Sequence, residues 1–365
     1  MKNYLTLTVL GLSLATKAFA APFLAIGDGA ELFVTGSLSV RADDNIFLAA
    51  NDEDDIIFEV APGAELVFGK GGQIQGRLAI VDAFTMYQDN DGLNSNLFST
   101  DFNANYDDGK LKAGTALSYR ELNQNTADIR GLTRRNVVSA SLNGEVIMTQ
   151  VTSVASGLSF SHEDYKRADY GDSDTLTVPV NVYYKSTPKS DLSLGYRFRD
   201  YETEIGSDSV DHFFNIGARG QFTPKLSGNF AVGLNTRKAG GNEDSDLGID
   251  SSFNLELTAK TAAQFGLSRD FGTTPQGQQQ YNTSFNTRVS TKIDARLSAY
   301  VGASYRQIDY STRTDDFYDA NLGGGYSFNN SASLSVSYAY RTYLSDLRAS
   351  EFTNHVFSVS ASLRY

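Results

Sequence analysis

Arginine recurs in similar surroundings along this sequence, at Arg41, Arg120, Arg197, Arg199, Arg237, Arg306 and Arg341. Arginines that face one enclosed space would favour anionic or sugar-like solutes, because rings of charged side chains set the selectivity of pores. The same arginines could instead pair with acids on neighbouring strands, such as Asp101, Asp211 and Asp319, and only join the strands of a wall. We favour pairing and keep selectivity as the alternative.

One of these pairs can be placed from the sequence. If the turn between Asp309 and Asp316 closes symmetrically, Arg306 lies opposite Asp319 on the next strand. We therefore include Asp319 with the seven arginines as candidate pore-lining residues.

Histidine is the other side chain that could do chemistry, and the sequence contains only His162, His212 and His355. A hydrolase would need a histidine held next to an acid or a serine in an accessible site. Each histidine instead shares its side of the strand with apolar residues, so we expect all three to face outward near a membrane interface. No nucleophile motif or phosphate-binding glycine loop is present, and an enzyme is not expected.

The elements that position these residues are strands with one apolar face. In "VFSVSASLRY" at the end of the chain, Phe357, Val359, Ala361, Leu363 and Tyr365 alternate with serines and an arginine. Side chains alternate across a strand, so this period places the apolar residues on one face and the polar residues on the other. Segments of the same kind begin near residues 31, 54, 73, 97, 110, 135, 150, 174, 190, 209, 226, 249, 262, 280, 294, 316, 331 and 350.

Short and long connections take turns between these segments. "YDDGK" at 106, "STPKS" at 186, "FTPKL" at 222, "STKID" at 290 and "FNNSA" at 328 are short, whereas the runs at 123, 164, 237 and 273 are longer and polar. This alternation is typical of bacterial outer-membrane barrels, and each strand is long enough to cross a bilayer. The sequence predicts an all-β fold: a closed antiparallel transmembrane β-barrel of about 18 strands, with 16 as the alternative.

The weakest predicted strands are the second and third. The second contains Pro62 and Gly63, and in the third Asp82 falls on the apolar face unless a β-bulge shifts it.

Residues 1–20 read as a secretory signal peptide: Lys2, an apolar run, and "AFA" at residues 18–20, where Ala18 and Ala20 are the small residues of the cleavage site. Residues 21–365 then form a single barrel domain, because no composition break marks a second one.

The formal net charge of −12 argues against a nucleic acid partner. The chain has no cysteine, so disulfides do not stabilise it.

Acidic clusters lie in two predicted outer loops, at residues 42–55 and at 242. They could bind divalent cations that bridge to lipopolysaccharide phosphates, but we favour solvated loops. "DNDGLNSN" at 89 begins like a calcium loop, yet Thr100 stands where the bidentate acid would be needed. We expect no metal site and no cofactor.

The C-terminal strand resembles the signal by which outer-membrane barrels are recognised by the barrel assembly machinery. The matching residues are Phe357, Val359, Leu363 and Tyr365.

In addition, "LSVRADDNIFL" (38–48) and "DDIIFEVAPGAELVFG" (54–69) resemble the opening of the outer-membrane beta-barrel porin family often found near exopolysaccharide export genes. The Asp44-Asn45 and Pro62-Gly63 pairs carry this resemblance. It implies a channel in the outer membrane of a Gram-negative bacterium, with a polysaccharide as one candidate solute.

The sequence thus predicts a porin-like channel for passive diffusion or export of small hydrophilic, including saccharide, solutes, in contact with outer-membrane lipid and lipopolysaccharide. A barrel of this size has room for an aqueous lumen. We expect the longest loop, around 122–134, to be too short to fold in as a broad constriction. The alternative is a non-conducting structural or adhesion barrel that acts through its extracellular loops. Solute, selectivity and oligomeric state stay open.

Overall fold

The structure is a computed structural model that describes residues 22–27, 29–126, 128–129 and 131–365. The predicted signal peptide lies outside the described residues. No helix among the described residues has the length and apolar character needed to span a membrane.

One antiparallel sheet contains all nineteen strands found in the described part of the chain. The strands are β1 (Leu24–Ile26), β2 (Ala30–Asp43), β3 (Asp55–Phe68), β4 (Ile74–Tyr87), β5 (Ser95–Asp107), β6 (Leu111–Gln124), β7 (Thr133–Ile147), β8 (Thr152–Tyr165), β9 (Ser173–Thr187), β10 (Ser190–Thr203), β11 (Ser209–Gln221), β12 (Leu226–Ala239), β13 (Asn242–Glu256), β14 (Thr261–Thr273), β15 (Gln279–Lys292), β16 (Leu297–Tyr310), β17 (Thr314–Ser327), β18 (Ala332–Ser345) and β19 (Phe352–Arg364). Two 3₁₀ turns, η1 (Asp91–Leu93) and η2 (Arg348–Ser350), lie in the connections.

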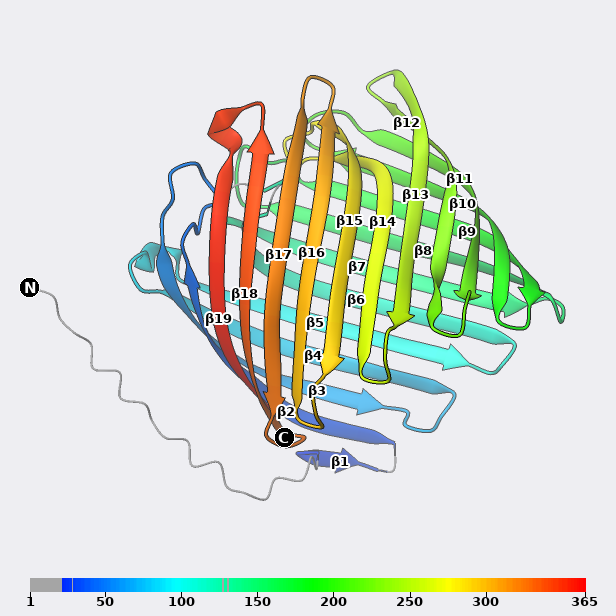
Figure 1. Cartoon of the computed structure of the whole chain (residues 1–365), viewed down its shortest axis with the longest axis horizontal. Helices are drawn as coiled ribbons and strands as arrows, with labels where there is room; N and C mark the ends of the chain where they lie inside the picture. Colours follow the sequence, from blue (N-terminus) through cyan, green and yellow to red (C-terminus); the bar gives the residue numbers. More distant parts are fainter. Residues whose placement is uncertain (1–21, 28, 127, 130) are drawn as a thin grey trace, which may run out of the picture.

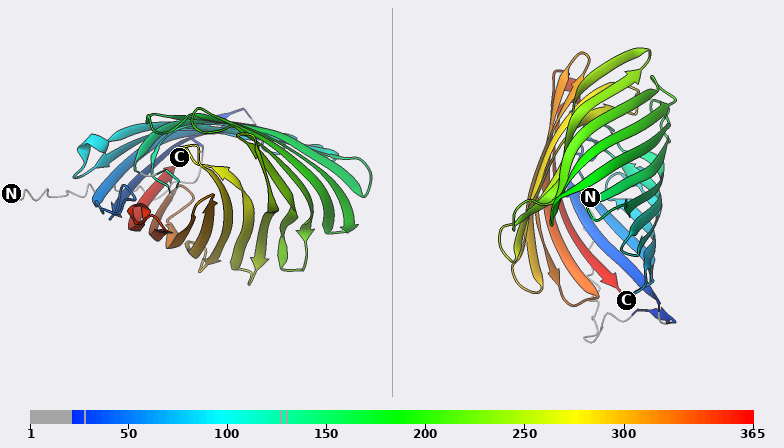
Figure 2. Two further views of the ribbon diagram at one scale, coloured as in Figure 1. Left: turned by 90° about the horizontal axis from the view of Figure 1, so that it is seen from above. Right: turned by 90° about the vertical axis from the view of Figure 1, so that its right-hand side faces the viewer.

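Strands β2–β19 close into a ring. Each pairs with the next in sequence, and β19 pairs back onto β2, from Val356 opposite Asp43 to Arg364 opposite Thr35. Figures 1 and 2 show this continuous wall, in which β3–β8 form the side behind β14–β19. The closed barrel of 18 strands is confirmed, and the 16-strand alternative is wrong.

Strand β1 is an additional short strand at the seam of the ring. It pairs with β2 at Leu32, Glu31 and Ala30, below the point where β19 ends. It therefore occupies the edge of β2 that the shorter β19 leaves open, which protects backbone groups that would otherwise lack a partner.

The apolar face of the strands is turned outward. Leu142, Leu194 and Ile216 keep about 60% of their surface exposed, at 59%, 65% and 63%. Only small clusters of apolar residues are buried, such as Leu48 with Ile308, Tyr343 and Phe352. Because no second sheet covers the exposed leucines and isoleucines, their environment is hydrocarbon, as a membrane barrel requires.

Both described chain ends lie at the same end of the barrel, which we call the periplasmic end. The connections there are short, including 108–110, 188–189, 222–225 and 328–331. The opposite, outer end carries longer connections, including 44–54, 125–132 and 166–172. The alternation of turns and loops along the chain is confirmed for most hairpins.

The hairpin of β16 and β17, with only residues 311–313 in its outer turn, is one exception, and the hairpin of β12 and β13 is another. We expected a long acidic loop from residue 237 and a strand from about 249, but β13 begins at Asn242. Gly240 and Gly241 adopt φ of 56° and 85°, so two residues suffice for the turn. The acidic residues at 242–246 extend the hairpin and do not form a loop.

Asp82 lies on the outward face of β4, between Ile80 and Phe84, which are both exposed to the outside. The β4–β5 register runs without a shift and places Asp82 opposite Phe98. No bulge therefore turns this carboxylate inward, and Oδ1 of Asp82 is buried without a hydrogen-bond partner.

Candidate functional site: the charged lumen

The seven predicted arginines occupy inward positions on six of the strands that run toward the outer end. Arg41 lies on β2, Arg120 on β6, Arg197 and Arg199 on β10, Arg237 on β12, Arg306 on β16 and Arg341 on β18. They alternate with outward residues such as Leu38, Leu234 and Val301, which are exposed. Sequence parity therefore places these side chains on the lumen side of the wall.

Most of these arginines pair with acids on adjacent strands. Arg120 lies 2.6 Å from Asp101, and Nε of Arg237 lies 2.6 Å from Asp211. Arg341 lies 3.3 Å from Asp319. The predicted partners Asp101, Asp211 and Asp319 are confirmed, because inward residues on paired strands lie within reach of each other.

The predicted pairing of Arg306 with Asp319 is wrong. In the register of β16 with β17, Arg306 lies opposite Phe317, and Asp319 lies opposite Ser304. Asp309 pairs with Thr314, so the centre of the turn lies one residue nearer Asp309 than we assumed. A shift of one residue in the turn centre moves the partner of every residue by two positions.

Arg306 instead binds a residue from a distant loop. Nη1 and Nη2 of Arg306 donate to Oδ2 and Oδ1 of Asp128 at 2.9 and 3.0 Å. Asp128 belongs to the connection between β6 and β7, which we expected to be too short to fold in as a broad constriction. The structure shows that this connection nevertheless reaches into the outer mouth as far as Arg306.

The reason is that two loops support each other inside the outer mouth. The side-chain amide of Asn125 donates to the carbonyl of Ile46, and the backbone N–H of Gly131 donates to that of Phe47. Ile46 and Ile129 are buried, at 1% and 5% exposure. The loop of residues 125–132, of which the structure describes all but 127 and 130, is therefore held by Asn125 and Gly131 against the loop of residues 44–54 and does not have to cross the lumen unsupported.

These loops and the barrel wall enclose a cavity of about 790 Å³, which we call the outer cavity. Its charged lining consists of Arg41, Asp43, Asp128, Arg306, Asp319 and Arg341. Its apolar lining includes Ile46, Leu48, Ile57, Tyr87 and Phe317. Ser284, Asn286 and Ser304 add polar groups from β15 and β16. Polar and charged side chains therefore line this cavity at least as much as apolar ones do. Convergent polar groups beside apolar and aromatic side chains are a feature of binding sites.

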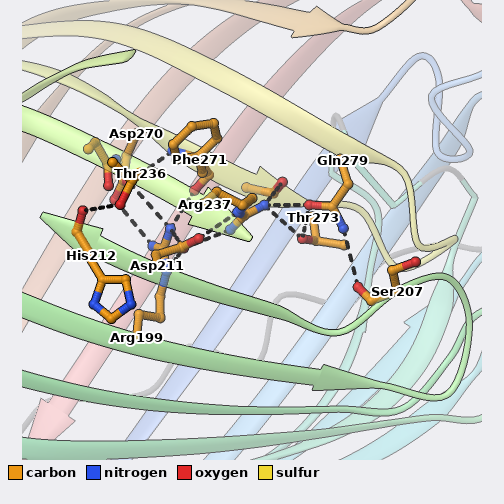
Figure 3. A network of polar contacts seen from close by, with 12 residues as sticks. Arg199, Ser207, Asp211, His212, Thr236, Arg237, Asp270, Phe271, Thr273 and Gln279 are labelled. Carbon is orange, nitrogen blue, oxygen red and sulfur yellow. Dashed lines mark hydrogen bonds and ion pairs between the residues drawn. The ribbon is translucent and has the colours of Figure 1, made fainter. Parts of the chain in front are cut away.

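A second charged cluster holds the outer half of β14 inside the barrel, and Figure 3 shows it. Arg199 lies 2.5 Å from Asp211 and 3.2 Å from Asp270, and Arg197 lies 2.8 Å from Asp270. Arg237 completes the cluster through Asp211. We call these five residues the strand clamp.

The strand clamp is possible because β14 leaves the wall. Pairing of β13 with β14 stops at Ile249 opposite Arg269. Beyond that point Asp270 reaches β10 and β12, and the N–H of Gly171 donates to the carbonyl of Pro275 across 2.9 Å. The bent end of β14 narrows the outer half of the lumen. Our sequence prediction missed Asp270, although its inward parity could have suggested it.

Two further clusters near the periplasmic end were also missed. Arg219 bridges Glu145 and Asp191, at 2.5 and 3.0 Å, and its guanidinium stacks 3.4 Å above the ring of Tyr183. Arg364 similarly binds Glu65 at 3.1 Å and stacks on Phe33, which occupies an inward position. The alternation of inward and outward residues along each strand was the signal in the sequence that could have identified both clusters.

The three histidines face outward, as predicted. Nδ1 of His162 lies 2.9 Å from Asp174, that of His212 lies 2.8 Å from the Tyr196 hydroxyl, and that of His355 lies 2.7 Å from the Tyr338 hydroxyl. Each partner lies on the outward face of an adjacent strand. In the part of the chain that the structure describes, no group of three or more acids and histidines is arranged to hold a metal ion.

The residues of the predicted assembly signal lie on the outward face of β19 and at its end. Phe357, Leu363 and Tyr365 are exposed, and Val359 shares their face. Tyr365 and Val34 exchange backbone hydrogen bonds of 2.9 and 2.6 Å. Recognition of this strand by an assembly machinery stays a prediction.

Comparison with known proteins gives the fold and the family. A family model described as "Putative beta-barrel porin 2" matches residues 32–365. The outer membrane protein OpdK of Pseudomonas aeruginosa is similar in structure, with 10% identity, a TM-score of 0.52, and coverage of 92% of this chain and 99% of OpdK. A structure of OpdK with vanillate gives a TM-score of 0.51 at 10% identity over the same shares of the chains, 92% and 99%. OccK11 (OpdR) of the same bacterium gives 0.50 at 12% identity, covering 95% and 99% of the two chains. No curated protein matches the sequence significantly.

Proposed function

This chain belongs to the beta-barrel porin family that matches residues 32–365 and is an outer-membrane porin-like channel, and we propose that small hydrophilic solutes diffuse passively through its lumen. The observation that carries the proposal is the ring of 18 strands with apolar residues outside and charged and polar residues inside. Such a wall lets lipid contact one face and water the other.

The lining supports a narrow passage at the outer end. The inward loops of residues 44–54 and 125–132 and the bent end of β14 occupy part of the outer half. Below them, inward positions are often small: Gly195 and Asn215 on paired strands, or Ser337 and Ser358. Small side chains leave space for water, so we propose that selection of solutes takes place near the outer mouth.

We infer that saccharides are among these solutes. Hydroxyl and amide side chains such as Ser284, Asn286 and Ser304 line the outer cavity together with the aromatic rings of Tyr87 and Phe317. Sugars present both hydroxyl groups and apolar ring faces, so this mixture of donors, acceptors and rings suits them. The resemblance of the first hairpin to porins found near exopolysaccharide export genes supports the same class.

Single-channel conductance of the purified protein in planar bilayers tests the proposal. We expect discrete steps in the picosiemens to nanosiemens range and, in proteoliposomes, swelling with monosaccharides that slows as the sugar becomes larger. Stable insertion with no conductance and no swelling would favour the alternative, a structural or adhesion barrel. The paired arginines and inward loops of the outer half are the observations that keep this alternative open.

We infer further that residues 1–20 are removed on export and that residues 21–365 form the mature barrel domain. N-terminal sequencing of protein from outer membranes should then begin at Ala21. A sequence that begins at Met1 would contradict the inference.

A further inference from the structure

The pair of Arg306 and Asp128 joins a loop to the far wall of the outer cavity. Its two hydrogen bonds, of 2.9 and 3.0 Å, use both terminal nitrogens of Arg306 and both oxygens of Asp128. This bidentate geometry is the one in which arginine recognises a free carboxylate. Both side chains are partly accessible, at 24% and 26%, so the pair is open to exchange.

Arg306 has no other acceptor among the described residues. Its Nε is buried and without a hydrogen-bond partner, and Phe317, opposite it in register, offers only a ring 6.0 Å away. Among the described residues that line the outer cavity, Arg306 is therefore the arginine that already binds a carboxylate, that of Asp128, through two hydrogen bonds.

A second arginine of the cavity has spare capacity for an anion. Arg41 makes no ion pair with a described carboxylate, and its Nε is buried without a hydrogen-bond partner. Arg41 and Arg306 both line the outer cavity. If Asp128 moves out to the aqueous mouth, these two cations and Arg341 face only Asp43 and Asp319, and the lining gains one net positive charge.

We propose that the outer cavity binds a small carboxylate-bearing solute, whose carboxylate replaces Asp128 on Arg306. Asp128 then acts as a tethered internal ligand, and the loop of residues 125–132 is released while the solute occupies the site. The exchange costs little, because the guanidinium keeps two hydrogen bonds to a carboxylate throughout. This inference rests on one part of the proposed function, namely that solutes enter the lumen.

The test uses the full-length mature protein in detergent and two probes of the same size, glucuronate and glucose. Isothermal titration calorimetry measures binding, so the result does not depend on conductance. We expect glucuronate to bind and glucose to bind at least about tenfold more weakly, because glucose lacks the group that forms the bidentate contact.

Variants assign the site. Asp128→Asn removes the competing carboxylate and should tighten glucuronate binding by about tenfold, because the binding-competent state no longer has to displace an internal ligand. Arg306→Gln should abolish binding, and Arg306→Lys, which keeps the charge but lacks the fork, should weaken it. Asp101→Asn is the matched control, because it breaks the similar Arg120–Asp101 pair outside the outer cavity and should leave binding unchanged.

The outcomes separate this inference from the proposed function. Equal or weaker glucuronate binding by Asp128→Asn, or unchanged binding by a folded Arg306→Gln or Arg306→Lys variant, overturns it, and so does equal binding of glucose. Absence of glucuronate binding to the wild-type protein also overturns it, even when the channel conducts. Silence in planar bilayers together with glucuronate binding at Arg306 would contradict passive conduction and leave the site intact.

Discussion

Arg237 and Asp211 form a bidentate ion pair within the lumen wall. Nε and Nη2 of Arg237 donate to Oδ1 and Oδ2 of Asp211 at 2.6 and 2.8 Å, and the side chains keep only 5% and 1% of their surface exposed. Arg199 binds the same carboxylate at 2.5 Å. One acid therefore neutralises part of the charge of two arginines in a region with little water.

Removal of that acid should destabilise the barrel strongly. Asp211→Asn leaves Arg199 and Arg237 close together without their shared counter-charge, and we expect the free energy of unfolding to fall by about 3–5 kcal/mol. Chemical unfolding in detergent, followed by far-ultraviolet circular dichroism, measures this free energy. Asp101→Asn is the control: its pair with Arg120 is much more exposed, so about 0–1 kcal/mol is expected. Equal losses in the two variants would show that burial does not decide the effect.

Asp270 should control how far the lumen opens. It holds the bent end of β14 against β10 through Arg197 and Arg199. We expect Asp270→Asn to loosen this contact and to raise single-channel conductance, with larger current fluctuations. Asp250→Asn removes an inward acid on neighbouring β13 and serves as the control for charge alone. If both variants change conductance equally, the effect comes from charge and not from release of β14.

Asp82 should be a stabilising position to replace. Its carboxylate lies on the lipid face with one oxygen unpartnered, and charge on that face is unfavourable by an amount that depends on depth. We expect Asp82→Leu to raise the free energy of unfolding in lipid vesicles by about 1–2 kcal/mol. Asp101→Leu, an inward acid on adjacent β5, should not. A loss of stability in Asp82→Leu would indicate that another molecule covers this carboxylate in the membrane.

The strand order and the inward position of the arginines and their acid partners could be predicted because both follow from alternation. Lipid on one face and water on the other fix the inward or outward position of residues such as Arg237 and Asp211, and neighbours in the ring then meet. Which inward residues lie opposite each other depends also on register, so Asp319 pairs with Arg341 and not with Arg306. Contacts that leave the wall follow no such period. Asp128 reaches Arg306 through a loop that rests on another loop, and Asp270 meets Arg199 only because β14 bends.

Turn chemistry explains the remaining differences. The run after Arg237 is acidic and glycine-rich, which is typical of a loop, yet Gly240 and Gly241 can take positive φ and close a two-residue turn. The register at Arg306 depended on a turn centre that the sequence does not determine. Composition indicates that a connection is polar, but backbone geometry decides its length.

A pH-dependent contribution to stability is expected from the turn between β15 and β16. The carboxylate of Asp294 accepts the backbone N–H groups of Arg296 and Leu297 at 2.7 and 2.8 Å. These two hydrogen bonds lower the pKa of Asp294 below its ordinary value. Because the folded pKa is depressed, the stabilisation is present above the unfolded pKa and is lost as the pH falls through the folded pKa.

The variant Asp294→Ala should therefore be less stable than the wild type at neutral pH, and the difference should vanish in strong acid. Unfolding curves between pH 7 and the lowest pH at which the barrel stays folded measure this. Asp294→Asn is the control: both N–H groups bind a single oxygen, Oδ1, in the wild type, so the amide oxygen of Asn can still accept both without titrating. A difference between the wild type and Asp294→Ala that does not depend on pH would rule out titration of this carboxylate as the cause.

Tyr365 should matter more for assembly in cells than for stability of the finished barrel. Its backbone closes the seam with Val34, and its ring packs edge-on against Phe23, with ring centres 6.5 Å apart. Tyr365→Ser keeps both backbone hydrogen bonds but removes the terminal aromatic ring, so we expect refolding in detergent to stay near wild-type level. In cells, we expect several-fold less folded barrel in the outer membrane, measured by heat-modifiable electrophoretic mobility. Tyr365→Phe keeps the ring and should assemble normally. Normal accumulation of Tyr365→Ser in cells would exclude the terminal ring as an assembly signal, and an equal fall in cells and in detergent would assign it to the seam instead.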